Sequence, residues 1–159
     1  GGRTDEHERF IEPTLLDMHI SLSDADADAK ASSHEVLTEE IFGPVLPILT
    51  FNNIADVAGY ITRREKPLAF YYFGREADGW SIIRHTSSGG ACINDTIMHI
   101  ANEHVPFGGV GNSGMGSYHG EESYRAFSHY RTVVATGTWI DLPFRYMPYK
   151  MFSLVKKIV

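Results

Sequence analysis

Between residues 45 and 94 the sequence alternates between short apolar runs and stretches with helical periodicity, and this alternation limits the fold more than any other feature. Residues 45–51 form a largely apolar run, and residues 68–73 form a second run that is rich in aromatic side chains. Runs of this length and composition predict buried strands. The stretch between them predicts a helix that Asn52 or Asn53 could cap, because its apolar residues recur at i, i+3, i+4 and i+7. These residues are Ile54, Val57, Ala58 and Ile61.

A second helix and a third strand continue the same order. Residues 75–85 predict a helix with Trp80 and Ile83 facing inward, and a glycine pair then turns the chain into a strand over residues 91–94. The order strand, helix, strand, helix, strand predicts an α/β fold with a mainly parallel sheet and flanking helices. A chain of 159 residues suits one ordinary domain of this class.

Charge and cysteine content narrow the possible environments and partners. The formal net charge of −6 argues against a general surface for nucleic acids or anionic membranes. The single cysteine excludes an internal disulfide framework and fits a reducing compartment, so we expect a cytoplasmic location. No apolar run reaches the roughly 18 residues that a membrane-spanning helix needs. The chain begins Gly1-Gly2-Arg3 without a targeting pattern, which predicts the interior of a longer chain or a trimmed start.

Two segments outside the strand–helix region of residues 45–94 have unusual compositions. Residues 21–33 contain a low-complexity run of alternating Asp and Ala, which predicts a surface loop or a disordered insert. A calcium loop is disfavoured, because the run does not have the spacing of glycine and glutamate that such a loop needs. Residues 150–159 carry apolar side chains at helical spacing among lysines, so this tail could touch a membrane surface. Packing on the protein itself or on a partner subunit is the favoured interpretation.

Two segments far apart in the chain, residues 39–44 and 106–120, each place an aromatic ring beside glycine and proline, with polar groups close by. Such a backbone can approach a flat ligand and hold a ring in place. Neither segment contains a nucleophile with its own base, so the pair predicts part of an active-site wall. The second segment lies in a long loop, residues 96–119, for which Phe107 and Met115 are candidate anchors. Loops of this length in compact domains are usually functional or disordered.

Residues 109–114 match the letters G-x-G-x-x-G, which in another context would indicate a dinucleotide-binding turn. That turn must follow a strand and open a helix, with an acidic residue about 20 positions later. Here a loop precedes the glycines, more glycines follow, and the acidic residue is missing. Close packing of a loop therefore explains the pattern better.

Glu39 and Glu40 could be an ordinary solvated pair, although the rigid Gly43-Pro44 sequence after them favours a placed carboxylate. Such a carboxylate could accept hydrogen bonds from a ribose diol. The neighbouring Phe42 ring could pack against a nicotinamide or a sugar.

Cysteine and histidine offer no strong reactive site or metal site. Cys92 lies in an apolar strand context, so a buried structural role is favoured over a nucleophilic one. Only His99 and His104 have the spacing of zinc ligands, and no C-x-x-C accompanies them. A zinc site is therefore improbable, and no metal is expected.

At these residues the chain resembles the aldehyde dehydrogenase superfamily. Residues 39–44 resemble the family's E-E-I-F-G-P signature, and Asn94-Asp95 followed by residues 106–109 resemble its later N-D and P-F-G-G elements. Residues 111–120 are similar to the class 3 branch, which includes the fatty aldehyde dehydrogenases. The agreement runs along almost the whole chain.

The resemblance implies an enzyme that oxidises aldehydes to carboxylic acids with NAD or NADP, through a thioester on a cysteine. By match to the motifs, Glu40 would bind the nicotinamide ribose and Phe42 would pack near the nicotinamide ring. Phe107 would line the aldehyde pocket. The further wall candidates are Ile97, Ile100 and His119.

The resemblance also implies that the reacting groups lie outside this chain. In the family, the nucleophilic cysteine, the general-base glutamate, the oxyanion-hole asparagine and the dinucleotide-binding domain all precede the E-E-I-F-G-P signature. Cys92 follows that signature, so it does not take the nucleophile's role, and no residue here is assigned as catalytic. We therefore expect residues 1–128 to be the later, C-terminal half of a catalytic domain and to be inactive alone.

The C-terminal part is expected to serve assembly. Residues 129–138 resemble the family's oligomerisation strand, with the strand itself over residues 130–136, and a homodimer through this strand is implied. Residues 139–159 form the tail. The alternative is a non-enzymatic dimerisation or interaction module that retains this part of the fold.

Overall fold

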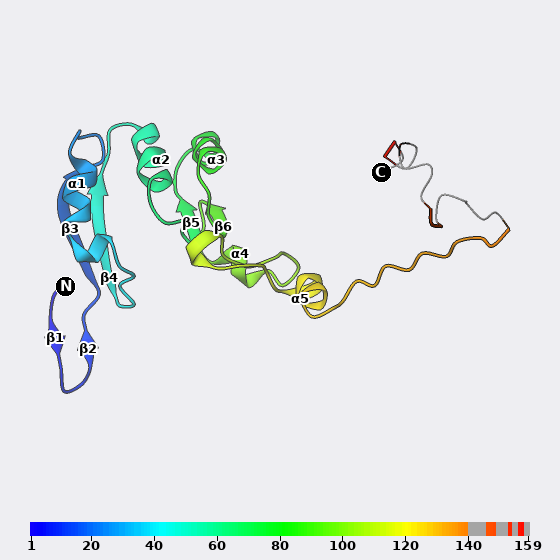
Figure 1. The fold of residues 1–159 in the computed structure, drawn as a ribbon. Helices are drawn as coiled ribbons and strands as arrows, with labels where there is room; N and C mark the ends of the chain where they lie inside the picture. Colours follow the sequence, from blue (N-terminus) through cyan, green and yellow to red (C-terminus); the bar gives the residue numbers. More distant parts are fainter. Residues whose placement is uncertain (140–145, 149–152, 154–155, 158–159) are drawn as a thin grey trace. The chain divides into compact units, whose positions relative to one another are not determined.

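The computed structural model describes residues 1–139, 146–148, 153 and 156–157. It divides into two units, residues 1–128 and residues 129–159. Every helix and strand bounded within the described residues lies in the first unit. Figure 1 shows the path of the chain.

The first unit opens with three strands, and helices and strands then follow one another along the chain. Its strands are β1 (Thr4–Asp5), β2 (Phe10–Ile11), β3 (Thr14–Ser21), β4 (Val45–Thr50), β5 (Ala69–Tyr72) and β6 (Gly90–Ile93). Its α-helices are α1 (Ala27–Ser32), α2 (Ile54–Thr62), α3 (Glu76–His85), α4 (Met98–Ala101) and α5 (Gly120–Ala126). Two short 3-10 helices are η1 (Glu35–Leu37) and η2 (Gly111–Ser113).

Strands β3 and β4 form a parallel pair in which Leu15 lies opposite Leu46. Exposure along β4 alternates residue by residue, as the two-residue period of a strand requires. On one face Leu46 and Ile48 are exposed, while Leu49 on the other packs against the buried side chain of Ile20. The pair therefore has one covered face and one apolar face that no described element covers.

Helix α1 corrects the expectation for residues 21–33, which are not a loop throughout. Ala27 and Ala31 are buried and form a small core with Ile20 of β3. Ala27 lies in the Asp-Ala run and Ala31 just after it, four residues further on, so the two alanines share one helical face. Asp24 and Asp26 are exposed. The low-complexity pattern concealed this helical face, because an exact alternation resembles no amphipathic helix.

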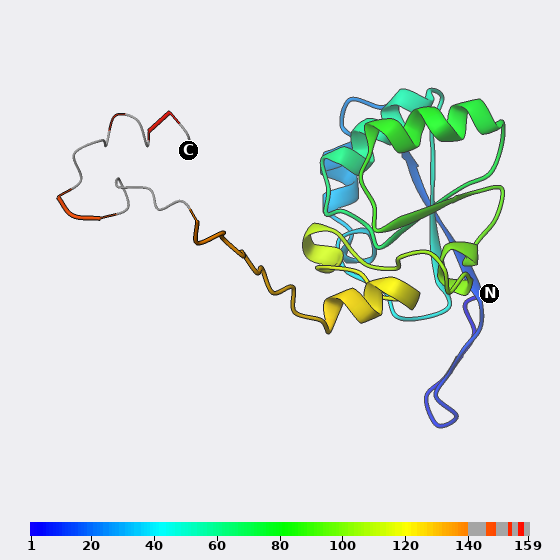
Figure 2. The ribbon, with the colours of Figure 1, turned by 90° about the vertical axis from the view of Figure 1, so that its right-hand side faces the viewer.

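Strands β5 and β6 form a second parallel pair, with Phe70 opposite Ala91 and Tyr71 opposite Cys92. Helix α2 precedes the pair, and the Asn53 side chain caps it by accepting a hydrogen bond from the Ala55 amide. Helix α3 connects the two strands, and it contacts both α2 and β6 (Figure 2). The expected order of strand, helix, strand, helix, strand is therefore confirmed, as is the asparagine cap.

Two details of the expected α/β fold differ from the structure. The four long strands form two separate parallel pairs, and a small antiparallel pair, β1 with β2, is added; no described residues join them into one sheet. Trp80 of α3 does not face inward but is 46% exposed, because Gly79 and Ile82 occupy the buried side of the helix. Gly79 lies so close to the Tyr72 ring that a bulkier side chain would not fit there.

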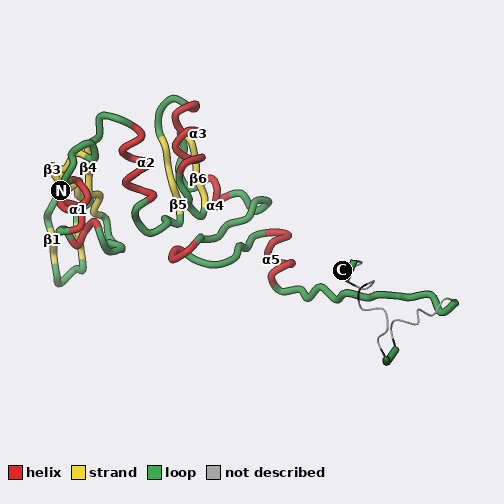
Figure 3. The backbone as a smooth tube through the Cα atoms, turned by 45° about the horizontal axis from the view of Figure 1, so that its top comes forward, coloured by secondary structure: helices red, strands yellow, loops and turns green. Residues whose placement is uncertain are grey.

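Residues 129–139 form no strand in the structure and run as loop after α5 (Figure 3). This differs from the strand expected over residues 130–136. A strand needs a neighbour for its backbone hydrogen bonds, and no described residues provide one. Most of the tail, including the helical pattern expected over residues 150–159, lies outside the described residues. Among those described, no helix combines the length and the apolarity needed to cross a bilayer.

Candidate active-site wall

The segment of residues 39–44 presents its polar and aromatic side chains to the outside. It follows η1 and leads into β4. The Glu40 side chain is exposed, and within the described residues its carboxylate makes no hydrogen bond or ion pair. The Phe42 ring is 88% exposed. A charged group and a ring without internal partners are available to a ligand or to further polypeptide.

The loop after α4 is closed at its base by an antiparallel bridge between Phe107 and Tyr118. Each residue's amide donates to the other's carbonyl over 2.9 Å. Inside the loop, the Ser113 hydroxyl accepts from the Val110 amide at 3.0 Å and donates to the Val110 carbonyl at 2.9 Å. The loop is therefore ordered by its own hydrogen bonds around η2.

Close contacts between backbone segments explain the glycines of this loop. A Cβ atom on Gly109 would lie 2.1 Å from the Ser113 carbonyl oxygen, and one on Gly108 would lie 2.1 Å from the Gly116 carbonyl oxygen. No strand leads into Gly111, and the helix that it opens has only three residues. These observations confirm the loop-packing interpretation of residues 109–114. Met115 is 97% exposed, so the expectation that it anchors the loop is wrong.

Three rings gather around Phe107 at the base of this loop. The ring centroid of Phe107 lies 5.9 Å from that of His99, 5.5 Å from that of Tyr118 and 5.9 Å from that of His119. Tyr118 and His119 also meet edge to face, with their centroids 4.8 Å apart. Such pairs contribute about 0.5–1.5 kcal/mol each beyond the area that they bury. Of the predicted wall residues, the structure therefore brings Phe107 and His119 together.

Several predicted wall residues have unusual backbone conformations. Phe42, Ile97 and His119 have φ angles of 46°, 66° and 86°, in a region that residues other than glycine seldom adopt. For the β-branched Ile97 this conformation is a clear outlier. Strained backbone concentrates at functional sites, where the surrounding structure must hold it. Among the described residues, Arg9, His19 and Asn94 also have positive φ angles, so the strain is compatible with a role for the three predicted residues but does not single them out.

Ile97 and Ile100 both lie at helix α4, next to the ring cluster. Ile97 is the residue before the helix and is 59% exposed, whereas Ile100 within it is half-buried. The Ile100 amide donates to the Ile97 carbonyl at 2.7 Å. No described contact joins Glu40 or Phe42 to these residues, so the shared cleft that the motifs imply stays a prediction.

Sequence reasoning missed the part that His99 plays, because it considered this residue only as a metal ligand. His99 Nδ1 lies 3.4 Å from Cys92 Sγ, and its ring packs between Tyr71 and Phe107. Cys92 is buried, as expected. No group of three or more metal-ligating side chains occurs within the described residues. The only sequence signal for the contact is Gly90, whose missing side chain leaves room for the imidazole.

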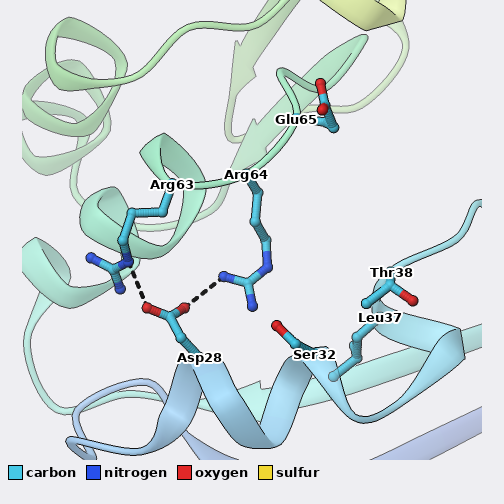
Figure 4. Close-up of a pocket in the computed structure, with 7 residues that line it drawn as sticks. All are labelled: Asp28, Ser32, Leu37, Thr38, Arg63, Arg64 and Glu65. Atoms are coloured by element: carbon cyan, nitrogen blue, oxygen red, sulfur yellow. Dashed lines mark hydrogen bonds and ion pairs between the residues drawn. The ribbon is translucent and has the colours of Figure 1, made fainter.

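A separate pocket of about 700 Å³ lies beside α1 and contains none of the predicted wall residues (Figure 4). Asp28 bridges two guanidinium groups there, with 2.6 Å to Arg63 Nε and 2.8 Å to an Arg64 nitrogen. The hydrogen bonds from Arg64 and then Arg63 hold the pKa of Asp28 below its ordinary value. The two ion pairs therefore join α1 to the residues that follow α2.

Comparisons with known proteins agree with the motifs. Residues 1–133 match the model of the aldehyde dehydrogenase family. The rat (Rattus norvegicus) protein "Aldehyde dehydrogenase family 3 member A2" is 46% identical over 86% of this chain and 26% of its own length. The rat protein "Aldehyde dehydrogenase, dimeric NADP-preferring" is 45% identical over 83% of this chain and 27% of its own length.

A solved structure, the substrate-bound state of Staphylococcus aureus AldH, is similar along nearly the whole chain. Its TM-score is 0.75 and its sequence identity 42%, over 99% of this chain and 32% of the solved chain. This chain therefore spans only about a quarter to a third of the length of the proteins that it matches.

Proposed function

The chain belongs to the aldehyde dehydrogenase family, and on that premise we propose that it forms part of the catalytic unit of an enzyme that oxidises aldehydes to carboxylic acids with NAD or NADP. The observation that carries the proposal is the family match over residues 1–133, which includes both motif-bearing segments. The rat relative described as NADP-preferring supports a nicotinamide cofactor.

In this proposal, residues 39–44 hold the nicotinamide end of the cofactor, which accepts a hydride when bound. Glu40 accepts hydrogen bonds from the ribose hydroxyls, because its carboxylate has no partner among the described residues. Phe42 offers a flat apolar surface to the nicotinamide ring, which its 88% exposure leaves free. The segment thus offers an acceptor for the ribose hydroxyls and an apolar surface for the nicotinamide ring.

The aldehyde is bounded by Phe107 and by the side chains at α4. The Phe107 ring contacts three other rings, so it offers a fixed apolar surface. Ile97 and Ile100 extend that surface, and His119 adds a polar edge. An apolar wall favours substrates with a hydrocarbon or aromatic body, and it excludes water from the reacting carbonyl.

An exchange experiment tests this proposal. Residues 1–133 would replace the matching segment of the Staphylococcus aureus enzyme, to which the chain is 42% identical. We expect the chimera to reduce NAD or NADP in the presence of an aliphatic or aromatic aldehyde. The change Phe107→Ala should lower its kcat/KM on the order of ten- to a hundredfold, equivalent to about 1.4–2.8 kcal/mol of transition-state stabilisation. A chimera that folds and binds cofactor but turns over no aldehyde would refute the proposal.

Alone, the chain should be inactive. Covalent catalysis needs an activated nucleophile that the substrate can reach, and the one thiol, Cys92, is buried. The purified chain with aldehyde and NAD should therefore form no more reduced nicotinamide than buffer does. Turnover above that of buffer, lost in Cys92→Ala, would show that this reasoning is wrong.

We further propose that residues 130–136 pair with another subunit as a strand. Tyr130, Val133 and Val134 are 74%, 73% and 81% exposed, a β-prone set without a described covering surface. The relative described as dimeric supports this assembly. Val134→Pro removes a backbone donor and should shift the protein toward monomer in light scattering, whereas Val134→Thr should not. Equal masses for both variants would contradict a strand-mediated dimer.

A further inference from the structure

Four parts of the fold meet at His99: α4, β5, β6 and the loop that begins at Phe107. It lies on α4, its imidazole is half-buried, and its Nδ1 faces the Cys92 thiol of β6 at 3.4 Å. Its ring centroid is 5.6 Å from that of Tyr71 on β5 and 5.9 Å from that of Phe107 at the base of the loop. A single side chain thus connects α4, both strands of the parallel pair, and the loop.

The missing side chain of Gly90 leaves the space that this imidazole fills. A Cβ atom at position 90 would lie 2.3 Å from His99 Cδ2 and 3.1 Å from His99 Nε2. The ring therefore occupies the volume that a side chain of β6 would otherwise fill. On this side the ring is held by packing against Gly90, since within the described residues the buried His99 Nε2 atom has no hydrogen-bond partner.

The Cys92–His99 pair is suited to holding the ring and not to reacting. Cys92 is 9% exposed, so a substrate has little access to its sulfur. A thiol is also a weak hydrogen-bonding group, so it orients the imidazole without a strong charge interaction.

Helix α4 needs such an attachment. It contains only four residues, and isolated helices of that length do not form in water. Its first turn follows Ile97 at a φ of 66°, a conformation that costs on the order of 1–3 kcal/mol. Packing of α4 on β6 must offset this cost, and His99 is the α4 side chain with described contacts to that strand.

From these contacts we propose that His99 is a positioning residue, which fixes Phe107 and the strained turn at Ile97 against β5 and β6. It does so without touching the aldehyde itself. The inference rests on the proposed function in one respect, since Phe107 and Ile97 are the residues assigned there to the aldehyde wall.

The test uses the whole 159-residue chain, with 4-fluorophenylalanine incorporated at position 107 and its fluorine resonance measured by NMR. The unsubstituted protein should give one resonance displaced from that of the free amino acid, because neighbouring rings surround the probe. His99→Leu should move the resonance toward the free amino acid. It should also speed amide exchange at Ile100 and Ala101 by on the order of tenfold or more, the equivalent of about 1.4 kcal/mol.

Matched variants separate positioning from general damage. His104→Leu changes an exposed histidine of the same segment and should leave the resonance in place. Gly90→Ala should reproduce the effect of His99→Leu, because the new methyl group displaces the imidazole. In a His99→Ala background, Gly90→Ala should add little, since the clashing ring is gone.

Three results would overturn the inference: a resonance at the free amino-acid position in the unsubstituted chain, an unchanged resonance in His99→Leu, or an equal effect of Gly90→Ala with and without the imidazole. A kinetic measurement distinguishes failure of the positioning role from failure of the proposed function. In the complete enzyme that contains this chain, His99→Leu should raise KM for the aldehyde more than it lowers kcat. If His99→Leu moves the fluorine resonance but leaves KM and kcat unchanged, the assignment of Phe107 and Ile97 to the aldehyde wall is wrong and the positioning role of His99 stands.

Discussion

A methyl group at position 109 should open the glycine-rich loop. In Gly109→Ala the new Cβ would lie 2.1 Å from the Ser113 carbonyl oxygen and 2.3 Å from the Ser113 carbonyl carbon. Ordinary contact begins at 3.4 Å, so backbone must move by more than 1 Å, and no flexible side chain can absorb that shift.

The magnitude follows from what the movement disrupts. Overpacking costs typically about 1–3 kcal/mol. The two hydrogen bonds between Ser113 and Val110 contribute roughly 1 kcal/mol each when intact, and a partial loss is expected. The free energy of opening the loop should therefore fall by about 2–4 kcal/mol.

Hydrogen exchange measures this opening directly at the bridge that closes the loop. The amides of Phe107 and Tyr118 are bonded across that bridge. They should exchange roughly 30- to 1000-fold faster in Gly109→Ala, or reach the unprotected rate, because each 1.4 kcal/mol is tenfold. Gly43→Ala is the control, since its new methyl group would meet nothing nearer than 3.7 Å. Unchanged exchange in Gly109→Ala, or an equal change in the control, would refute the packing explanation.

Two further predictions concern the ion pairs of Asp28 and the small core around α1. Because the pKa of Asp28 is lowered in the folded state, its ion pairs stabilise the protein at neutral pH and are lost as the pH falls below about 4. The side chain is 44% exposed, so Asp28→Asn should cost only about 1 kcal/mol at pH 7, and this cost should shrink as the pH falls through the lowered pKa of Asp28. The measurement is the difference in Arg64 amide protection, and a pH-independent difference would contradict this reasoning. Ile20→Ala truncates a side chain that is 3% exposed and should cost about 2–5 kcal/mol, measured as amide protection across β3. Leu15→Ala, at a position that is 70% exposed, should cost no more than about 0.5 kcal/mol. Similar losses in both variants would show that the described core is wrong.

Local sequence patterns predicted the elements that local physics decides. The helix over Ile54–Thr62 and its Asn53 cap follow from spacing and from one side-chain acceptor. The parallel pairing of β5 with β6 follows from the helix between them, since parallel strands need such a crossover. The family was likewise evident from the two motifs, and the comparisons confirm the resemblance to its class 3 branch.

Expectations failed where an outcome depends on contacts between distant residues. The sequence predicts that Trp80 faces inward, but Gly79 approaches Tyr72 closely and forms the buried side of α3 together with Ile82. The alternating Asp-Ala run looked unstructured, yet burial of Ala31 against Ile20 stabilises a helix there.

The amino-acid sequence by itself determined the order of helices and strands over residues 45–94, the glycine-dependent loop and the motifs that define the family, because these depend on neighbours within a few residues. Only the tertiary structure decided which of the candidate residues meet. It gathered Phe107 and His119 with His99 and Tyr118, since ring contacts depend on how separate segments pack. It also gave His99 its place over Gly90, which no local pattern encodes, because the empty space above a glycine is filled by a side chain nine residues away.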